Sequence, residues 1–567
     1  MTKKLLLAIS MLVVAITVNA QYRLLYETFS DGSGDTSRTL VTVAGDQLCI
    51  TSADPEEPNP IPGIAKHITY IDFARDTAYY QLYYSGKEQY FTGVSLHPDN
   101  DYQFEKVEII DGYRCKKYTT SLFSNRMEIW MTEDFKYRAT PTTTFADLPG
   151  VLVQYTRNGN TTTRLASESL EPTMRNKREI TPIVPSNLGT YMNSRQLGNL
   201  EKEKLVITIP VFKNAQICFN PKLEKSRIIP FDTVLPYSNG TIILKRLNFK
   251  QLPAHYQIFA ELTEQSNGDA YDRTGSIFVI PTTDISFVDA LIDSVGVLPT
   301  FTDKNGEQYQ GIKLEKNYTP LVELVRFFTP FGVKHFNQYR SLPDKEWEDA
   351  AYYKQDVSDL RQYLQGDVYI GAFIGNYDGG GHKISLDLKA YPESYEWKTG
   401  DDHLWTLPLF NTCNVMEMSG QNYGKFFETD SLTVTFIVPE GLSSLRLRYI
   451  STGHGGWDNG DEFVPKENVI LVDGQPRFRH TPWRSDCGTF RTLNPASGNF
   501  WNGTSSSDYS RSGWCPGTAT QPVYFDLTGL TPGEHTMTIA IPQGQREGSY
   551  FSAWNVSGVL IGLRTED

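Results

Sequence analysis

The amino-acid sequence predicts an all-β protein built from several sandwich domains. Short runs of alternating apolar and polar residues recur along the 567-residue chain, for example at residues 432–438, 444–450 and 535–541. Each run is rich in β-branched or aromatic residues and stops at Pro, Gly or Ser, as strands do. The 44 Gly and 31 Pro supply turns between such strands. Helical periodicity is scarce, although residues 358–365 suit a short helix before Gly366. This pattern is typical of β-sandwiches and jelly rolls rather than βαβ units.

The first 20 residues have the parts of a signal peptide. Lys3 and Lys4 form a short basic region, an apolar run covers residues 5–18, and residues 18–20 fit a cleavage site before Gln21. A transmembrane anchor is the alternative, but the run is short for a bilayer and no long apolar stretch follows it. We therefore expect an exported protein without a membrane span, either periplasmic or secreted.

The rest of the chain is longer than one hydrophobic core usually organises, so we expect three domains. Residues 171–204 contain three Pro, mixed charges and little apolar periodicity, which indicates a linker. A second break falls near residues 391–397, after a strand expected at 383–390. The expected β domains are residues 21–170, 205–392 and 393–567.

Charge and motifs exclude several classes of function. The net charge of -13 is spread along the chain, which argues against a nucleic-acid surface. The Gly-rich residues 376–382 lack the Gly-Lys-Ser/Thr of a phosphate loop, so we interpret them as a hairpin turn. The sequence has no His-Glu-x-x-His motif, no clustered Cys and no nucleophile elbow. We expect no metal and no cofactor.

A polar, Gly-rich loop at residues 451–463 follows a predicted strand and is a candidate functional site. It combines His454 with several acidic residues, and such loops often carry function because a rigid scaffold presents them. An exposed turn is one alternative. A calcium loop is another, because this loop has four oxygen donors at Asp458, Asn459, Asp461 and Glu462, but their spacing does not match an EF-hand.

Six Cys in an exported protein permit disulfides and leave fifteen pairings open. Cys487 and Cys515 lie in one segment and are the first pair we expect. Cys49–Cys115 and Cys218–Cys413 would then follow by domain.

Two further segments carry charged residues beside predicted strands. A disulfide at Cys515 would hold Arg511 and Trp514 on a rigid loop, which suits a carbohydrate or peptide ligand and equally a structural staple. Asp272 and Arg273 start a predicted strand, and an isolated Asp-Arg pair is more often a turn or an ion pair than a catalytic site.

Taken together, four stretches in order resemble the peptide-N-glycosidase F family of amidases, from about residue 205 to the C-terminus. They are Tyr-Asp-Arg at 271–273, Arg-Phe-Phe-Thr-Pro-Phe at 326–331, Gly-His at 453–454 with Glu-Phe at 462–463, and Arg-Ser-Gly-Trp-Cys-Pro-Gly at 511–517. The resemblance implies two consecutive jelly-roll domains and a Cys487–Cys515 disulfide.

The same resemblance implies site residues. Asp272 takes the position of the principal catalytic carboxylate and Glu462 that of the second. Seven residues are then expected in or beside the substrate cleft: Arg273, His454, Arg511, Trp514, Asp269, Tyr377 and Asp378. The chain departs from the family pattern at Gly375, where a further acidic residue is absent or replaced by Asp378. It also has Tyr377 in place of a Trp, and Gly460 and Val464 in place of a Cys pair.

The implied activity is hydrolysis of the amide bond between asparagine and the innermost N-acetylglucosamine of an N-glycan. The implied partners are N-glycosylated peptides and glycoproteins, and the enzyme is expected to be a monomer. An endo-type glycoside hydrolase is an alternative, because two carboxylates in a sugar-binding cleft are also its signature. A non-catalytic glycan-binding protein is a second alternative, against which the presence of both Asp272 and Glu462 weighs.

Residues 21–170 lie outside this resemblance. They contain Ile-Asp-Gly-Tyr-Arg-Cys-Lys-Lys-Tyr at 110–118 and Ala-Asp-Leu-Pro-Gly-Val-Leu at 146–152. These stretches resemble the GLPGLI-type β domain of exported Bacteroidetes proteins, with Asp147 and Val151 departing from the motif. Such a domain could extend the substrate cleft or act as a spacer.

Overall fold

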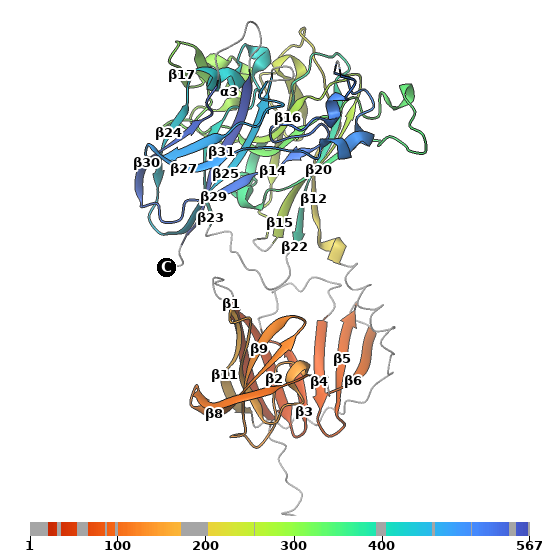
Figure 1. The fold of residues 1–567 in the computed structure, drawn as a ribbon, viewed down its shortest axis with the longest axis vertical. Helices are drawn as coiled ribbons and strands as arrows, with labels where there is room; N and C mark the ends of the chain where they lie inside the picture. Colours follow the sequence, from red (N-terminus) through yellow and green to blue (C-terminus); the bar gives the residue numbers. More distant parts are fainter. Residues whose placement is uncertain are drawn as a thin grey trace, which may run out of the picture. The chain divides into compact units, whose positions relative to one another are not determined.

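The computed structural model describes residues 21–30, 36–53, 66–84, 88–96, 100–171, 202–253, 256–392, 404–455, 460–500, 502–543 and 552–564. The chain divides into an N-terminal unit (residues 1–206 with 394–398) and a C-terminal unit (207–393 and 399–567), shown in Figure 1. The expected signal peptide and nearly all of the expected linker and of the break at 391–397 lie outside the described residues. No helix in the described part of the chain is long and apolar enough to cross a membrane.

The N-terminal unit is one antiparallel sheet in the strand order β6-β5-β4-β3-β2-β1-β11-β10-β9-β8-β7. Its strands are β1 (Gln21–Ser30), β2 (Thr36–Ala44), β3 (Gln47–Ser52), β4 (Lys66–Asp72), β5 (Thr77–Tyr84), β6 (Glu88–Ser95), β7 (Gln103–Ile110), β8 (Tyr113–Leu122), β9 (Asn125–Thr132), β10 (Val151–Arg157) and β11 (Thr161–Glu171). The short helix η1 (Thr143–Phe145) and the chain after it pack on one face, where Phe145 and Ala146 join the core. The segment at 146–152 therefore serves packing.

The C-terminal unit begins with a sandwich of two antiparallel sheets (Figure 1). The first sheet orders β12 (Ile207–Ile217), β22 (His382–Pro392), β15 (Tyr256–Ser266) and β20 (Ala351–Asp356). The second sheet orders β13 (Val234–Tyr237), β14 (Ile242–Phe249), β21 (Gly366–Ile374), β16 (Thr274–Ile280), β19 (Val322–Phe328) and β28 (Ala519–Thr520). Smaller elements are η3 (Ser238–Gly240), α3 (Phe287–Ile292), η4 (Val295–Val297), β17 (Thr300–Thr302), β18 (Gln308–Gln310), η5 (Asn337–Tyr339) and η6 (Ser358–Tyr363). The short helix η2 (Lys202–Leu205) precedes β12 and belongs to the N-terminal unit.

A second sandwich follows, also of two antiparallel sheets. One sheet orders β23 (Leu404–Asn411), β31 (Ala553–Arg564), β25 (Leu442–His454) and β29 (Val523–Asp526), and the other orders β24 (Leu432–Val438), β30 (Gly533–Ala540), β26 (Asn468–Val472) and β27 (Gln475–His480). Its short helices are η8 (Glu417–Ser419), η9 (Tyr423–Lys425), α4 (Phe426–Thr429), η10 (Cys487–Leu493) and η11 (Ser506–Asp508). The predicted all-β fold with two jelly-roll sandwiches is confirmed.

Burial along the strands follows the period of two that the sequence shows. Side chains of β24 alternate between buried and exposed over its whole length, as expected for a strand with one face on a core. By contrast, all seven residues of β19 are buried. This strand lies in a sheet that packs on its partner sheet through one face and on the second sandwich through the other.

The seam between the sandwiches is a buried network of charged and polar groups around β19. A register shift between Ile277 and Phe278 in the pairing of β16 with β19 lets Glu323 and Arg326 share one face. Arg326 donates to Glu323 at 2.6 Å, to the Thr452 hydroxyl at 3.0 Å and to the Asn555 carbonyl at 3.1 Å. The last two groups belong to the second sandwich, so the pair fixes one sandwich against the other.

Some local predictions are corrected. Residues 376–382 are no hairpin turn, because β21 and β22 on either side belong to different sheets. The short helix expected at 358–365 is present as the 3₁₀ helix η6. Cys487 and Cys515 form a disulfide, with Cα atoms 5.1 Å apart.

The other two expected cysteine pairings are wrong, since Cys115, Cys218 and Cys413 are thiols. Five strands separate Cys49 on β3 from Cys115 on β8. Cys413 is buried near Arg326 at the seam, whereas Cys218 lies near Asp378. Bridging a disulfide requires Cα atoms within about 7 Å.

Candidate active site

The loop between β15 and β16 holds Asp272 at the end of the first sandwich. Asp269 accepts the backbone N–H of Tyr271 through Oδ1 at 3.0 Å, which closes a turn. Thr329 accepts the N–H of Arg273 at 2.8 Å and donates to the carbonyl of Tyr271 at 3.0 Å. Both neighbours of Asp272 are therefore tied to the end of β19. Gly268 has φ +151°, and a Cβ there would lie 2.7 Å from Asp378 Oδ1.

Arg511 joins Asp272 to Glu462 across the seam. Its Nη1 lies 3.2 Å from Asp272 Oδ2 and also donates to Glu462 Oε1. Its Nη2 donates to the carbonyl of Ser506 at 2.7 Å. The arginine side chain is fully buried, while those of Asp272 and Glu462 are 18% and 20% exposed. Two carboxylates reachable from solvent thus share one buried guanidinium.

Burial sets the electrostatics of this pair. Burial raises the pKa of Asp272, and Arg511 opposes the rise without cancelling it. Burial also raises the pKa of Glu462 to about 7, again against Arg511, and the nearby Asp272 carboxylate raises it further. Two carboxyl groups beside one guanidinium can hold a proton between them near neutral pH, which is the state that acid–base chemistry needs.

Trp514 lies beneath the pair rather than facing solvent, and its contact with the substrate stays a prediction. Its ring stacks on Phe328 with centroids 4.1 Å apart, and its Nε1 donates to the carbonyl of Gly453 at 2.9 Å. The Arg511 guanidinium lies 4.4 Å from the Trp514 ring centroid. With 2% of its surface exposed, Trp514 supports Arg511 from below.

His454 ends β25 beside the same aromatic stack. Its ring lies 5.5 Å from that of Trp514, and its Nε2 is 2.8 Å from the Thr452 hydroxyl. Burial and the positive charges of Arg326 and Arg511 lower the pKa of His454 to about 3. The imidazole is therefore neutral and can exchange hydrogen bonds without carrying charge.

An exposed rim of aromatic rings surrounds Arg273. Tyr271 is 60% exposed and Tyr377 is 54% exposed, and the Arg273 guanidinium lies 4.9 Å and 5.9 Å from their ring centroids. The Tyr377 hydroxyl donates to Glu417 at 2.7 Å, which connects the rim to the second sandwich. Aromatic faces beside polar groups suit a sugar ring.

Asp269 and Asp378, which were expected in or beside the substrate cleft, form hydrogen bonds within the protein. Asp269 is 2% exposed and accepts from Arg273 Nε at 2.8 Å. Asp378 Oδ1 accepts the backbone N–H groups of Gly380 at 2.8 Å and Gly381 at 2.7 Å. Their hydrogen bonds shape the loops that carry Asp272 and Tyr377.

Two of the four oxygen donors suggested for a calcium loop bind other residues of the protein. Asp461 accepts from Trp554 Nε1 at 2.6 Å and forms an ion pair with Lys466 at 2.6 Å, while Glu462 binds Arg511. Asp458 and Asn459 lie outside the described residues. Among the described residues, no group of three or more His, Cys, Asp or Glu could hold a metal ion.

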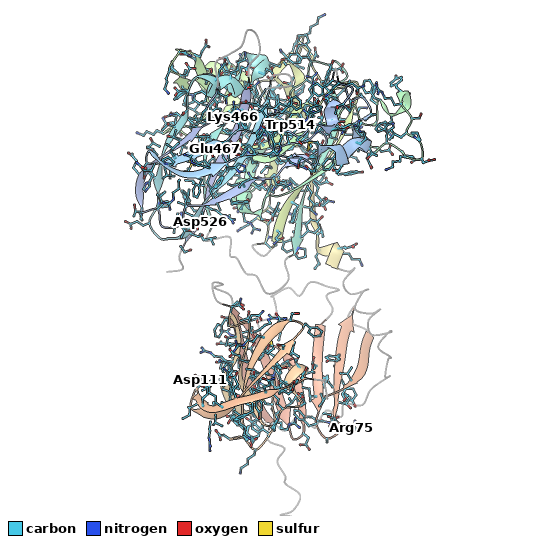
Figure 2. All side chains as sticks on the ribbon, viewed as in Figure 1. Arg75, Asp111, Lys466, Glu467, Trp514 and Asp526 are labelled. Atoms are coloured by element: carbon cyan, nitrogen blue, oxygen red, sulfur yellow. A yellow bond between two sulfur atoms is a disulfide. The ribbon has the colours of Figure 1, made fainter. Side chains whose placement is uncertain are left out.

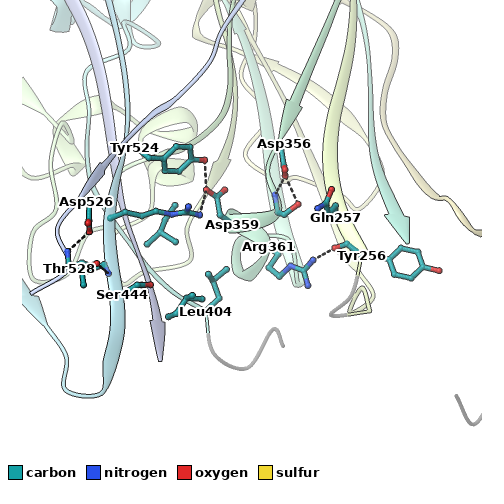
Figure 3. Close-up of a pocket in the computed structure, with 16 residues that line it drawn as sticks. Tyr256, Gln257, Asp356, Asp359, Arg361, Leu404, Ser444, Tyr524, Asp526 and Thr528 are labelled. Carbon is teal, nitrogen blue, oxygen red and sulfur yellow. Dashed lines mark hydrogen bonds and ion pairs between the residues drawn. The ribbon is translucent and has the colours of Figure 1, made fainter. Parts of the chain in front are cut away.

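A groove of about 470 Å³ lies at the other end of the sandwiches (Figure 3). Tyr256, Asp359 and Tyr524 are among the residues that line it, and no predicted site residue does. The strand β25 enters the groove near Ser444 and reaches the candidate site at His454. Figure 2 correspondingly labels Trp514 and Asp526, a groove residue, at separate places in the C-terminal unit.

Comparison with known proteins decides the family. The profile described as Peptide-N-glycosidase F, N terminal, matches residues 208–390, and that described as Peptide-N-glycosidase F, C terminal, matches residues 422–561. A solved structure described as PNGF-II is 38% identical, with a TM-score of 0.61, over 97% of this chain and 99% of that one. The chain belongs to the peptide-N-glycosidase F family.

Three further comparisons gave the following results. PNGF-II in a second crystal form is also 38% identical, with a TM-score of 0.61, over 96% of this chain and 100% of that one. The structure of PNGase F from Flavobacterium meningosepticum is 17% identical, with a TM-score of 0.43, over 63% of this chain and 96% of that one. No curated protein matches the chain.

The family resemblance reaches further forward than the sequence suggested. The profile described as N-glycanase peptide, N-terminal domain, matches residues 64–181. The expectation that residues 21–170 lie outside the resemblance is therefore wrong. Their similarity to GLPGLI-type domains stays a prediction.

Within this family framework, the structure brings together Asp272, Glu462, Arg511, Trp514 and His454, and places Arg273 and Tyr377 on the adjoining rim. Sequence reasoning missed Glu264 and His382, which lie behind Asp269. No motif indicates them, because they are distant in sequence. The one available signal was an acidic residue and a histidine at otherwise apolar positions of β15 and β22.

Proposed function

We propose that the protein hydrolyses the amide bond between an asparagine side chain and the innermost N-acetylglucosamine of an N-glycan. The observation that carries the proposal is the pair Asp272 and Glu462 on one nitrogen of the buried Arg511. Membership of the peptide-N-glycosidase F family, with 38% identity to PNGF-II over nearly the whole chain, supports the same reaction.

Amide hydrolysis needs a positioned water, stabilisation of charge on the tetrahedral oxygen and a proton for the leaving glycosylamine. We assign Asp272 as the main acid–base group and anchor for the sugar, and Glu462 as the group that orients the attacking water. Burial raises the pKa of both carboxyl groups, and Glu462, with a pKa of about 7, can accept or give a proton near neutral pH. Such proton transfer accelerates reactions by roughly 10² to 10⁴.

The two arginines have different roles in this mechanism. Arg511 is fully buried, so it holds both carboxylates and sets their charge rather than binding the glycan. Arg273 has 23% of its side chain exposed, next to Asp272, and can donate hydrogen bonds that hold the glycopeptide in the cleft. The rings of Tyr271 and Tyr377 offer faces for the sugars on either side.

The products would be a peptide with Asp in place of Asn and a glycan ending in 1-amino-N-acetylglucosamine, which loses ammonia spontaneously. The reaction needs no cofactor. We also propose export of the enzyme, on the signal-type sequence of residues 1–20, and action as a monomer on exposed glycopeptides.

The test is a mass spectrum of a defined N-glycopeptide after incubation with the purified protein. The proposal predicts loss of the whole glycan and conversion of Asn to Asp. A peptide that keeps one N-acetylglucosamine would instead show a glycoside hydrolase, the alternative that a carboxylate pair also suits. An intact glycopeptide bound by the protein would show a binding module. Asp526→Asn, in the distant groove, is the matched control and should cleave like the parent.

A further inference from the structure

A buried chain of charged groups runs behind the candidate site. His382 begins β22 and is fully buried. Its Nδ1 lies 2.8 Å from Glu264 Oε1 on β15, and its Nε2 lies 3.5 Å from Asp269 Oδ2. Asp269 in turn binds Arg273 Nε at 2.8 Å. The groups are thus arranged in the order Glu264, His382, Asp269, Arg273, and the chain ends beside Asp272.

The surroundings favour an imidazolium at His382. A histidine ring with a carboxylate at each nitrogen can donate to both only when it is protonated. Burial alone would lower the pKa of His382, but Asp269 and Glu264 outweigh it and raise the pKa to about 9. Burial raises the pKa of Glu264, whereas His382 and Arg273 hold the pKa of Asp269 at about 2 against burial. Tyr353 of β20 also faces Glu264.

Asp269 is the link between this histidine and the cleft. Its Oδ2 accepts from Arg273 Nε and lies within ion-pair distance, 3.5 Å, of His382 Nε2, while its Oδ1 closes the turn at Tyr271. Without a cation behind it, the buried Asp269 carboxylate would have Arg273 as its sole charged partner. Any movement of Asp269 would then shift the guanidinium and the loop of Asp272 together.

We infer that His382 is a positioning residue for substrate binding, which fixes Asp269 and, through it, the Arg273 guanidinium at the rim of the cleft. The inference rests on the proposed amidase function, because Arg273 is taken to contact the glycopeptide. The sequence does not connect His382 with Asp269, because 113 residues separate them.

Steady-state kinetics of His382→Gln on a defined N-glycopeptide test the inference. Gln can still donate through its amide group but carries no charge. We expect KM to rise roughly tenfold while kcat changes less than about threefold, because binding rather than chemistry is disturbed. Arg273→Ala should raise KM as well, and the double variant should be no worse than Arg273→Ala alone. If His382 only stabilised the fold, the effects of His382→Gln and Arg273→Ala on the kinetics would multiply in the double variant.

His535→Gln is the matched control, because His535 also pairs with a carboxylate, Asp473 at 2.7 Å, but on the far sheet of the second sandwich. Its kinetics should equal those of the parent. If His382→Gln does not fold, Glu264→Gln keeps the histidine and removes one carboxylate, and it should raise KM in the same direction.

Nitrogen NMR of the parent protein gives an independent readout. The signal of His382 is assigned by labelling or by its absence from the spectrum of His382→Gln. Both ring nitrogens of this histidine should stay protonated from pH 7 to near 9. A neutral ring at pH 7, an unchanged KM, or multiplying losses would overturn the inference. If the parent cleaves nothing, the proposed function fails, and the role of His382 is then decided by the Kd for the same glycopeptide, which must rise in His382→Gln.

Discussion

Arg511 controls the charge of both candidate catalytic residues through a single nitrogen atom. Removing it would leave Asp272 and Glu462 buried side by side without a cation, and like charges in that position cannot both stay ionised. The aromatic rings of Trp514 and Phe463, at 4.4 Å and 4.9 Å from the guanidinium, keep it dry and fixed. The proposed chemistry therefore depends on Arg511 and on the aromatic rings that pack against it.

Asp272→Asn should lower kcat by a factor of roughly 10² to 10⁴, the contribution expected of a general acid–base group. The side chain keeps its volume, so glycopeptide binding should persist. Single-turnover kinetics measure the first quantity and calorimetric titration the second. Full activity in Asp272→Asn would remove this residue from the mechanism.

The pH dependence of kcat/KM should show the raised pKa of the carboxyl pair. Glu462, whose pKa is about 7, must be ionised to orient and deprotonate water, so activity should rise with pH up to about 7 and then level. The apparent value belongs to the pair because both groups bind Arg511. Glu462→Gln should be slow and lack this inflection. A flat profile from pH 5 to 8 in the parent would contradict the assignment.

For individual residues, the sequence predicted the two carboxylates but not the side chains that pack around them. Four short stretches were enough to predict Asp272, Glu462 and Arg511 as site residues, and the structure places them in contact. The burial of Trp514 could not be predicted, because it depends on stacking against Phe328, far away in sequence.

Among the elements, two loops position the site, and each is fixed by specific bonds. The loop before β16 is tied to Thr329, and the loop carrying Arg511 pairs with Arg484 through two backbone hydrogen bonds of 2.8 Å and 2.9 Å. The disulfide Cys487–Cys515 closes this second loop over a sequence separation of 28. Rigid loops hold reacting groups in place and so reduce the entropy lost at the transition state.

Replacing Cys487 and Cys515 by Ser should lower the free energy of unfolding of the C-terminal unit by roughly 3.5 kcal/mol, as chain-entropy arguments give for a loop of this length. Activity should fall as well, because Arg511 lies four residues from Cys515. Urea unfolding and glycopeptide kinetics measure the two effects. Unchanged stability and activity would show that the hydrogen bonds alone hold the loop.

Strand prediction succeeded where one face of a strand is buried and the other is wet, as in β24, because this gives the period of two. Prediction from the sequence failed for the segments that connect the strands. The stretch at 376–382 looks like a hairpin turn in sequence, yet β21 and β22 pair with strands from other parts of the chain. The pairing of the short β28 with β19 is equally long-range, and no local signal announces it.

In the C-terminal unit as a whole, the site exists only because two sandwiches are held in register. Asp272 belongs to the first and Glu462 and Arg511 to the second. The fully buried Glu323 and Arg326, with Arg448 donating to the carbonyl of Glu323 at 3.2 Å, lock the sandwiches together. The sequence predicted the two jelly rolls but not this seam, because residues three apart in a regular strand point to opposite faces.

Arg326→Ala should cost about 3–5 kcal/mol of unfolding free energy, because it leaves Glu323 as an unpaired buried charge. The double variant Glu323→Leu with Arg326→Met removes both charges and should be less destabilised. Denaturant unfolding of the three proteins checks this. Equal losses in the single and double variants would mean that packing, not charge pairing, dominates the seam.

The most direct test of the account is cleavage of a defined N-glycopeptide in heavy-oxygen water by the parent protein, Asp272→Asn and Glu462→Gln. Hydrolysis at the asparagine amide predicts that the parent releases the whole glycan and leaves an Asp carrying one heavy oxygen. Both variants should form this product far more slowly. A peptide that retains one N-acetylglucosamine and no heavy oxygen, or cleavage that does not depend on the two carboxylates, would contradict it.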